Sequence, residues 1–402
     1  MQVADNALAV MVSPHIHEKG RTIERGMLDV LIALVPVVAV AIVVFGMNVI
    51  YIIAVSVITA GLTEVVVRRV LGRRQSLHDL SAMVTGLLFA LVLPPTTPLW
   101  VVALGAFIAV AVAKELFGGL GKNVFNPALF ARLVLMVTPL AVYVHKYARP
   151  FFWKATGFFT PIATSIDNSV VGRAAYKTLT GRVVLNAATG APNALTGATP
   201  LTLIKNGSML ANTVSSSTPV GATWLTTTGR PSFWSTFLGL RSGSIGEISI
   251  LALLIGGAYL IYRGTIDWRI PTGMIGSFFL LTAVTWNHPV YQLLGGGLVL
   301  GAFYMATDWV TSPMTRRGKW IYAVGIGVTI ALLRFFSPWP EGVAIAILQW
   351  NLITILIDRY VTQPRFGEAR RPWFARTRGY AGPSVEVAAV PAGKVLPAGG
   401  RS

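Results

Sequence analysis

The chain has no cysteine, only five histidines, and few charged residues, which make up 12% of its 402 residues. The absence of cysteine excludes disulfides, cysteine-ligated iron–sulfur clusters and thiol catalysis in this chain. If the protein handles electrons, it needs an organic cofactor or haem, and five histidines argue against a multi-haem protein. Soluble domains carry about a quarter charged residues. The scarcity of charge therefore excludes a water-soluble fold of this size.

The chain is rich in long apolar runs, and hydrophobic residues make up 54% of it. Crossing a membrane takes about 20 apolar residues, and the run Leu80–Leu93 is short for this. The sequence predicts an all-α integral membrane protein with about ten transmembrane helices, five on each side of a long polar region. The predicted spans are Met27–Phe45, Val49–Val67, Leu80–Leu93, Leu99–Phe117, Pro127–Val144, Ile248–Tyr262, Ile270–Thr285, Leu293–Ala306, Ile321–Phe336 and Val343–Leu356.

Lys and Arg residues gather in alternate connections between these spans, beginning with the N-terminal arm and ending with the C-terminal tail. The other short connections contain neither Lys nor Arg; they are residues 46–48, 94–98, 287–289 and 337–340. Because cytoplasmic loops are the basic ones, we expect a multi-pass protein with both termini in the cytoplasm. The net charge of +18 has the same cause, and it points to anionic membrane lipid as a partner rather than to nucleic acid.

Five spans are an odd number, so the second five enter the membrane from the opposite side. If the halves are repeats, they are inverted repeats, which often place functional sites on broken helices. The third span of each half is short and interrupted, by Leu93-Pro94-Pro95 and by Gly295-Gly296-Gly297; tight helix packing is the other explanation of these glycines. The predicted organisation is a cytoplasmic arm (1–26), a first five-helix repeat (27–145), an extracytoplasmic loop (146–247), a second five-helix repeat (248–358) and a basic, disordered cytoplasmic tail (359–402).

The outer loop contains the string Thr196-Gly197-Ala198-Thr199, followed by Pro200. It resembles the site at which some redox membrane proteins carry FMN on a threonine through a phosphoester bond, which a separate flavin transferase makes. The small Gly-Ala step lets a phosphate approach the backbone closely, Thr199 offers the hydroxyl, and Thr196 can hydrogen-bond locally. Taken alone the string is weak evidence, because Thr223 ends a similar string, Val-Gly-Ala-Thr. The alternative is that the string forms a simple turn and carries no cofactor.

Further segments carry a wider resemblance; in chain order they are Ser13–His17 (SPHIH), Met27–Val30 (MLDV), Leu80–Leu88 (LSAMVTGLL), Leu93–Pro95 (LPP), Gly119–Asn123 (GLGKN), Phe125–Ala128 (FNPA), Gly243–Glu247 (GSIGE), Trp268–Pro271 (WRIP), Met305–Asp308 (MATD), Thr311–Pro313 (TSP) and Pro340–Val343 (PEGV). From about Ser13 to Gly367 the chain resembles the RnfD subunit of the Rnf complex, the ion-translocating ferredoxin:NAD oxidoreductase. It also looks like the related NqrB subunit of the sodium-translocating NADH:quinone reductase. The short N-terminal arm is closer to the Rnf protein.

The resemblance implies a membrane subunit of a redox-driven Na⁺ or H⁺ pump in the bacterial inner membrane, which relays electrons between the other subunits of the complex. It implies covalent FMN on Thr199, on the periplasmic side, and a flavin transferase for maturation. A second, non-covalent flavin, riboflavin in the quinone-reductase relative, is implied as well. Two residues depart from the family pattern: Asn193 replaces the usual Asp, and Thr196 replaces a common Ser. The chain lacks any site for NAD or ferredoxin, so it is one part of a complex and not a complete enzyme.

Two other interpretations of the whole chain remain open from the sequence. Two inverted five-helix halves also suit a solute transporter of the urea- or ammonium-channel type, which would carry no cofactor. A purely structural anchor for other subunits is the third possibility.

Four carboxylates, Asp29, Glu64, Glu115 and Asp308, lie in or at the ends of predicted spans. Ionisable residues are costly in a membrane and are candidates for an ion path. The alternative is that each sits at a cytoplasmic helix end and pairs with a nearby Lys or Arg. Asp308 is the strongest candidate, because it follows a glycine-rich short span. The sequence contains no catalytic triad, phosphate-binding glycine motif or metal-ligand cluster of recognisable spacing, so we predict no catalytic residue and no metal site.

Overall fold

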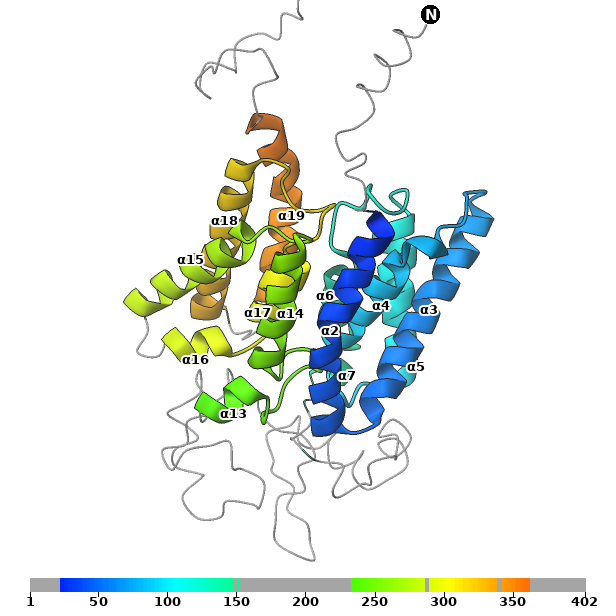
Figure 1. The fold of residues 1–402 in the computed structure, drawn as a ribbon. Helices are drawn as coiled ribbons and strands as arrows, with labels where there is room; N and C mark the ends of the chain where they lie inside the picture. Colours follow the sequence, from blue (N-terminus) through cyan, green and yellow to red (C-terminus); the bar gives the residue numbers. More distant parts are fainter. Residues whose placement is uncertain are drawn as a thin grey trace, which may run out of the picture.

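The computed structural model describes residues 22–145, 147, 151, 233–285, 289–337 and 342–361. All regular elements in these ranges are helices, arranged as a bundle (Figure 1). Thr196, Gly197, Ala198 and Thr199 lie outside the described residues, as do the predicted N-terminal arm up to residue 21 and the tail after residue 361.

The first half of the bundle contains two long helices followed by shorter ones. Its elements are α2 (Ile23–Phe45), α3 (Asn48–Val70), the 3₁₀ turn η1 (Leu77–Asp79), α4 (Ser81–Leu91), α5 (Leu99–Phe107), the π-helix η2 (Ile108–Glu115), α6 (Pro127–Val137) and α7 (Ala141–Val144). The sequence predicts one helix over Pro127–Val144, and this prediction was wrong. Thr138, the residue after the end of α6, is extended, as expected for a residue before proline, here Pro139.

The second half repeats the pattern of long and interrupted helices. Its elements are α13 (Phe233–Leu238), α14 (Ile250–Arg263), α15 (Arg269–Thr285), α16 (Pro289–Leu294), α17 (Leu298–Leu300), the π-helix η3 (Gly301–Met305), α18 (Arg316–Phe336) and α19 (Val343–Tyr360). The predicted third span is therefore broken between α16 and α17, at the glycines 295–297. Gly296 has a φ of 68°, a left-handed conformation that glycine adopts at little cost.

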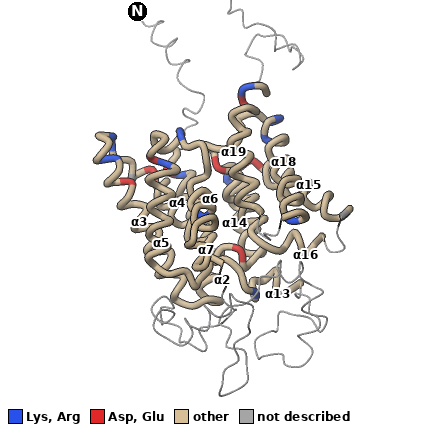
Figure 2. The backbone as a smooth tube through the Cα atoms, turned by 180° about the vertical axis from the view of Figure 1, so that it is seen from behind, with Lys and Arg blue, Asp and Glu red and all other residues tan. Residues whose placement is uncertain are grey.

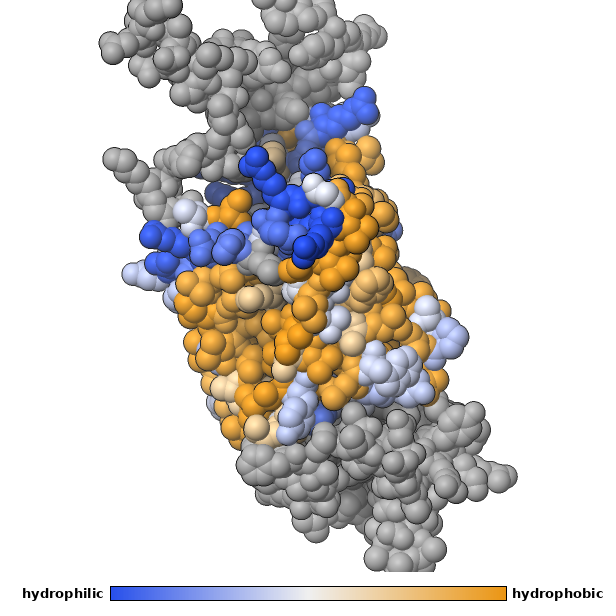
Figure 3. All heavy atoms as spheres, turned by 90° about the vertical axis from the view of Figure 1, so that its right-hand side faces the viewer, coloured by the Kyte–Doolittle hydropathy of each residue, from blue (hydrophilic) through white to orange (hydrophobic). Residues whose placement is uncertain are grey.

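Four helices of the described chain, α2, α3, α18 and α19, are long and apolar enough to cross a membrane. Shorter apolar helices, among them α4, α6 and α14, lie between them. Figure 3 shows a broad hydrophobic belt below a hydrophilic end. Among the described residues, most Lys and Arg lie at the end of the bundle where α2 begins and α19 ends (Figure 2). The described helices confirm the prediction of an all-α, multi-pass membrane protein.

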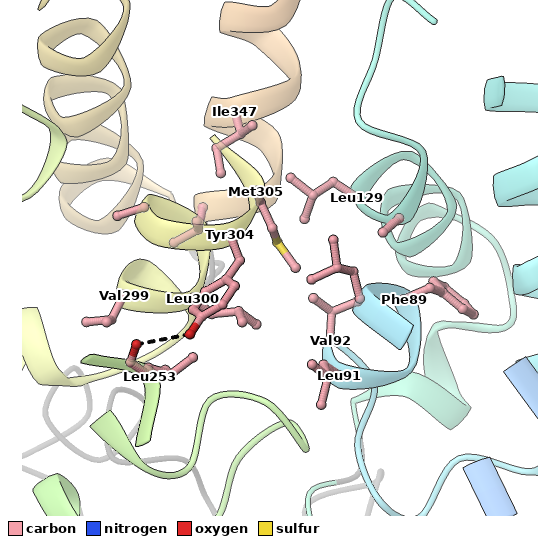
Figure 4. Packing of buried hydrophobic residues seen from close by; sticks show 14 of the residues in the cluster. Phe89, Leu91, Val92, Leu129, Leu253, Val299, Leu300, Tyr304, Met305 and Ile347 are labelled. Atoms are coloured by element: carbon pink, nitrogen blue, oxygen red, sulfur yellow. Dashed lines mark hydrogen bonds between the residues drawn. The ribbon is translucent and has the colours of Figure 1, made fainter. Parts of the chain in front are cut away.

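Hydrophobic side chains from both halves pack together in the middle of the bundle. Figure 4 shows Leu91 and Leu129 of the first half facing Leu300 and Met305 of the second; each of these four side chains is buried. The Tyr304 hydroxyl donates to the carbonyl of Leu253, at 3.1 Å, so a polar group in this core is satisfied.

Backbone groups at the helix breaks are bound by the other half or by buried arginines. The amide N–H groups of Ile245 and Gly246 donate to the carbonyls of Leu93 and Leu91, at 3.0 and 2.7 Å. At the break after α16, the Arg334 guanidinium donates to the carbonyl of Gly295 at 3.0 Å, and to that of Gln292. Arg241 donates to the carbonyl of Leu294. The breaks are therefore held in place, since unsatisfied carbonyls are costly in a membrane.

Candidate ion and cofactor site between the two halves

A pocket of about 90 Å³ lies where the two halves meet, close to Gly26 and Met27 at the start of α2. Its wall combines apolar residues with polar residues of both halves. The polar residues that line it are Ser81, Thr85, Lys114, Asn123, Asn126, Thr265, Tyr304, Thr307 and Asp308. A water molecule needs about 10–15 Å³ by this measure, so the space is large enough for several waters or a small ligand.

Two asparagines before α6 form one wall of the pocket. Asn126 is the N-cap of α6, and its Oδ1 accepts from the amide N–H groups of Ala128 and Leu129, as N-cap residues do. Its Nδ2 donates to the carbonyl of Met305, at 3.3 Å, and so ties α6 to η3 in the other half. Asn123 is buried, and within the described chain its Oδ1 has no hydrogen-bond partner. A buried acceptor of this kind points to a ligand or water in the pocket.

Asp308 lies on the opposite wall, just after η3, and is partly buried. Its carboxylate accepts from the N–H of Val310 at 3.4 Å and from the hydroxyl of Thr311 at 3.3 Å. Among the described residues it forms no ion pair with Lys or Arg. Asp308 therefore differs from the other three candidate carboxylates, each of which pairs with a basic side chain.

Glu64 and Glu115 come together in a cluster of charged side chains beside the pocket, and both carboxylates are fully buried. Arg68 joins them, because its Nε lies 3.2 Å from Glu64 and 3.0 Å from Glu115. Arg73 lies 3.7 Å from Glu115, and its side chain is 37% exposed. We call Glu64, Arg68, Glu115 and Lys114 the charged cluster. Its two acidic and two basic groups balance.

Lys114 links the charged cluster to the pocket. It belongs to the π-helix η2, an irregular helix that is frequent at functional sites. The side chain is 2% exposed, and its Nζ lies 3.2 Å from Oε2 of Glu64. The same Nζ donates to the hydroxyl of Ser81 at 2.6 Å, and Ser81 donates to Asp79 at 2.5 Å. Lys114 and Ser81 both line the pocket.

Asp29 lies apart from the charged cluster and holds the halves together. Its carboxylate accepts from the Tyr259 hydroxyl at 3.1 Å and the Thr265 hydroxyl at 3.1 Å. Arg263 completes the set, with Nε at 3.2 Å from Asp29. Because a carboxylate accepts about four hydrogen bonds, these contacts nearly saturate Asp29. The geometry favours a structural role, linking α2 to the end of α14.

Trp309 borders the pocket beside Asp308 and is 46% exposed. Its indole N–H donates to the carbonyl of Thr265, at 2.7 Å. The ring packs on Gly26 so closely that a Cβ at Gly26 would lie 2.0 Å from it. Only glycine fits at this position of α2, and the close packing orients the ring.

The connection between α14 and α15 carries a second group of charges at the basic end. Asp267 lies 3.0 Å from both Arg269 Nη1 and Lys319 Nζ. Burial raises the pKa of the Asp267 carboxyl, but hydrogen bonds from the Arg269 N–H and the Lys319 ammonium outweigh it. The pKa of Asp267 therefore lies below its ordinary value.

Sequence reasoning did not single out Lys114, Ser81, Asn123 or Asn126 as site residues. One signal was available for the asparagines: two amides close together before Pro127, at the start of an apolar helix, fit an N-cap in a membrane. The approach of Lys114 to Ser81 depends on how η2 packs against α4, which no local pattern reports.

Together these observations define a class: an all-helical, multi-pass membrane protein with a polar pocket and a buried charged cluster between its two halves. The chain belongs to the NQR2, RnfD, RnfE family, whose model matches residues 9–367. It is 37% identical over 362 residues to the D subunit of the Na⁺-translocating ferredoxin:NAD⁺ oxidoreductase complex of Acetobacterium woodii, covering 90% of this chain and 95% of the relative.

Two further relatives have similar names. The D subunit of the proton-translocating ferredoxin:NAD⁺ oxidoreductase complex of Clostridium ljungdahlii is 35% identical over 379 residues, which cover 92% of this chain and 99% of the relative. The D subunit of the ion-translocating oxidoreductase complex of Actinobacillus succinogenes is 33% identical, over 88% of this chain and 96% of the relative.

Proposed function

We propose that this chain is the RnfD subunit of a redox-driven, ion-translocating ferredoxin:NAD⁺ oxidoreductase complex, and that it relays electrons between partner subunits. Its similarity along nearly the whole length to relatives from such complexes supports the assignment. In the structure, the observation that supports the assignment is the charged cluster, which adjoins a polar pocket at the boundary between the halves. Buried ionisable groups in a membrane protein mark ion pathways. Glu64, Glu115 and Asp308 are the carboxylates that we assign to the ion path.

We propose further that ten helices form two inverted repeats, 27–145 and 248–358, with both termini cytoplasmic in the bacterial inner membrane. The packing supports this: α3 packs on α5 in the first half, as α15 packs on α18 in the second. The first helices of the halves, α2 and α14, pack together, and so do α6 and α19. The start of α2 and the end of α19 lie at the same, basic end (Figures 1 and 2), as an even number of crossings requires.

In this topology the loop 146–247 is periplasmic, and we propose that Thr199 within it carries FMN through a phosphoester bond. Thr196, Gly197 and Ala198 would provide the local conformation at which a flavin transferase acts. The support is the resemblance of this string to the family's flavin motif. The bound flavin would supply electron transfer, and the protein would supply its position and its electrostatic environment.

We assign the second, non-covalent flavin to the pocket between the halves. An isoalloxazine ring has a polar edge of N–H and C=O groups, which Asn123 and Asn126 could bind, and a flat face that suits Trp309. The unpartnered Oδ1 of Asn123 is the observation that fits best. The indole of Trp309, which packs on Gly26 and donates to the Thr265 carbonyl, would border one face of the ring.

The experiment that tests the flavin assignment is coexpression of the full chain with a flavin transferase, followed by a denaturing gel viewed under ultraviolet light. We expect a fluorescent band that disappears in Thr199→Ala. Thr223→Ala is the matched control, because Thr223 ends a similar string in the same loop, and it should keep the band. A band that survives Thr199→Ala would contradict the proposal. Absence of a band in the wild type would favour a solute transporter without cofactor.

A further inference from the structure

We propose that Lys114 is a mobile internal countercharge: it neutralises Glu64 when no transported cation is bound, and moves toward Asp308 when a cation takes its place at Glu64. This inference rests on the proposed function, since it assigns the ion path a residue that competes with the ion. It concerns the lysine rather than the carboxylates. Three observations carry it: the position of Lys114, the charge balance of the cluster, and the chemistry of the pocket wall.

Lys114 lies at the boundary between the charged cluster and the pocket. Its Nζ lies 3.2 Å from Glu64, and its side chain also lines the pocket that Asp308 borders from the other half. Lysine has a flexible four-carbon stem and a compact charge, so its ammonium can change partners within the pocket that Lys114 and Asp308 both line. Arg68 holds two carboxylates at once and is fixed by comparison.

The charge balance around Glu64 is lost when Lys114 turns away. Arg68 contacts the other oxygen of Glu64, Oε1, and is shared with Glu115, while Arg73 contacts Glu115 alone. Oε2 of Glu64, which Lys114 faces, would then be a buried carboxylate oxygen without a cation, which is unfavourable in a membrane. Glu64 would therefore bind a cation from solution. Conversely, a cation can bind Glu64 only by displacing the ammonium group.

The pocket wall offers the displaced ammonium a second set of partners. Asp308 forms no ion pair among the described residues. An ammonium group has three donors, and the two carboxylate oxygens of Asp308 and the hydroxyl of Ser81 can accept from them. The other titratable group on the pocket wall is Tyr304, whose hydroxyl already bonds to backbone carbonyls.

The exchange conserves charge. With Asp308 protonated while it lacks a cationic partner, the pair of Lys114 with Glu64 plus one Na⁺ becomes a pair of Lys114 with Asp308, a Glu64 carboxylate with bound Na⁺, and one released proton. If the transported cation is a proton, the proton leaves Asp308 and another binds Glu64, with no net release. A negative charge that develops on an occupant of the pocket would draw Lys114 in the same direction, and this would link electron transfer to cation uptake.

The test measures ²²Na⁺ binding to the purified full-length protein in choline chloride, with four single variants and one double variant. Lys114→Gln removes the competitor, so we expect Na⁺ to bind about tenfold more tightly, as for loss of one close charged partner. Asp308→Asn removes the second position of the ammonium and should weaken Na⁺ binding by a similar factor. In the Lys114→Gln background, Asp308→Asn should have no further effect. Lys114→Arg should stay close to wild type, and Lys122→Gln is a matched control that should change nothing.

The double variant separates this mechanism from a merely structural role. If Asp308→Asn weakens Na⁺ binding equally with and without Lys114, or if Lys114→Gln binds Na⁺ more weakly, the proposal is overturned. Should Lys114→Gln fail to fold, Lys114→Met, which removes the charge but keeps the length of the stem, replaces it in the same comparison with Asp308→Asn.

A proton-translocating protein would bind no Na⁺, and infrared difference spectroscopy then decides. Lys114→Gln should gain a protonated carboxyl band that is lost when Glu64→Gln is added. If neither Na⁺ binding nor this band responds to Lys114, the inference is wrong. Flavin content, measured on the same preparations, tests the proposed function separately, because none of these readouts requires electron transfer.

Discussion

Arg68 is the residue on which the charged cluster depends most, and its removal gives the most specific stability prediction. Its Nε lies 3.2 and 3.0 Å from two carboxylates that are fully buried, while its own side chain is 11% exposed. Arg68→Ala would leave these carboxylates with Lys114 and the outlying Arg73. Removal of one partner of a buried ion pair costs about 3–5 kcal/mol. We expect a loss of about 3 kcal/mol, at the lower end of that range, because two cations remain nearby.

The assay is unfolding of the purified protein in mixed micelles by titration with a denaturing detergent, followed by circular dichroism. The neighbour Arg69 is exposed and has no ion pair within the described chain. Arg69→Ala is therefore the control and should cost less than about 0.5 kcal/mol. Adding Glu115→Gln to Arg68→Ala should recover part of the loss, because the unpaired carboxylate disappears with it. Equal stability of Arg68→Ala and Arg69→Ala would refute the reasoning.

Three further predictions concern contacts around the pocket and at the basic end. Gly26→Val should displace the ring of Trp309, lower stability by about 1–3 kcal/mol and change the tryptophan emission spectrum; unchanged emission would contradict the packing. Asn126→Ala should cost about 1 kcal/mol for the lost N-cap, whereas Asn126→Ser, which retains a capping oxygen, should cost less by the same unfolding assay. Asp267 has a pKa below its ordinary value, so its stabilising contribution is present at neutral pH and disappears as the pH falls through that lowered pKa. Asp267→Asn should therefore lower stability at neutral pH, by less than about 1 kcal/mol because the pairs are partly exposed, and remove that part of the acid sensitivity.

The helices themselves were largely predictable because apolar length and loop charge are local properties of the chain. The short third span was expected over Leu80–Leu93 and α4 runs over Ser81–Leu91. The break at Gly295–Gly297 falls between α16 and α17. The end of α6 was missed, although Pro139 was visible in the sequence. A proline does not by itself divide a helix in this chain, since α2 continues through Pro36, so the apolar run alone could not show where α6 ends.

The site was less predictable, because its contacts join residues far apart in the chain. Asp29 binds Arg263 in the other half, and Glu64 meets Lys114 across two helices. The sequence allowed each carboxylate either a place on an ion path or a basic neighbour at a helix end. The helix packing gives Glu64 and Glu115 both features, since each pairs with a basic side chain and also lies beside the pocket. Only Asp308 is left without a basic partner among the described residues.

The most direct test of the account measures ferredoxin-dependent NAD⁺ reduction and ion uptake together, in proteoliposomes that contain the complex with its partner subunits. We predict that Glu64→Gln largely abolishes uptake of Na⁺ or H⁺ while electron transfer continues in the presence of an uncoupling ionophore. Glu24→Gln, in the exposed first turn of α2, is the matched control and should leave both rates unchanged. Ion uptake per electron that is the same in Glu64→Gln and in the wild type would contradict the assignment of the charged cluster to the ion path.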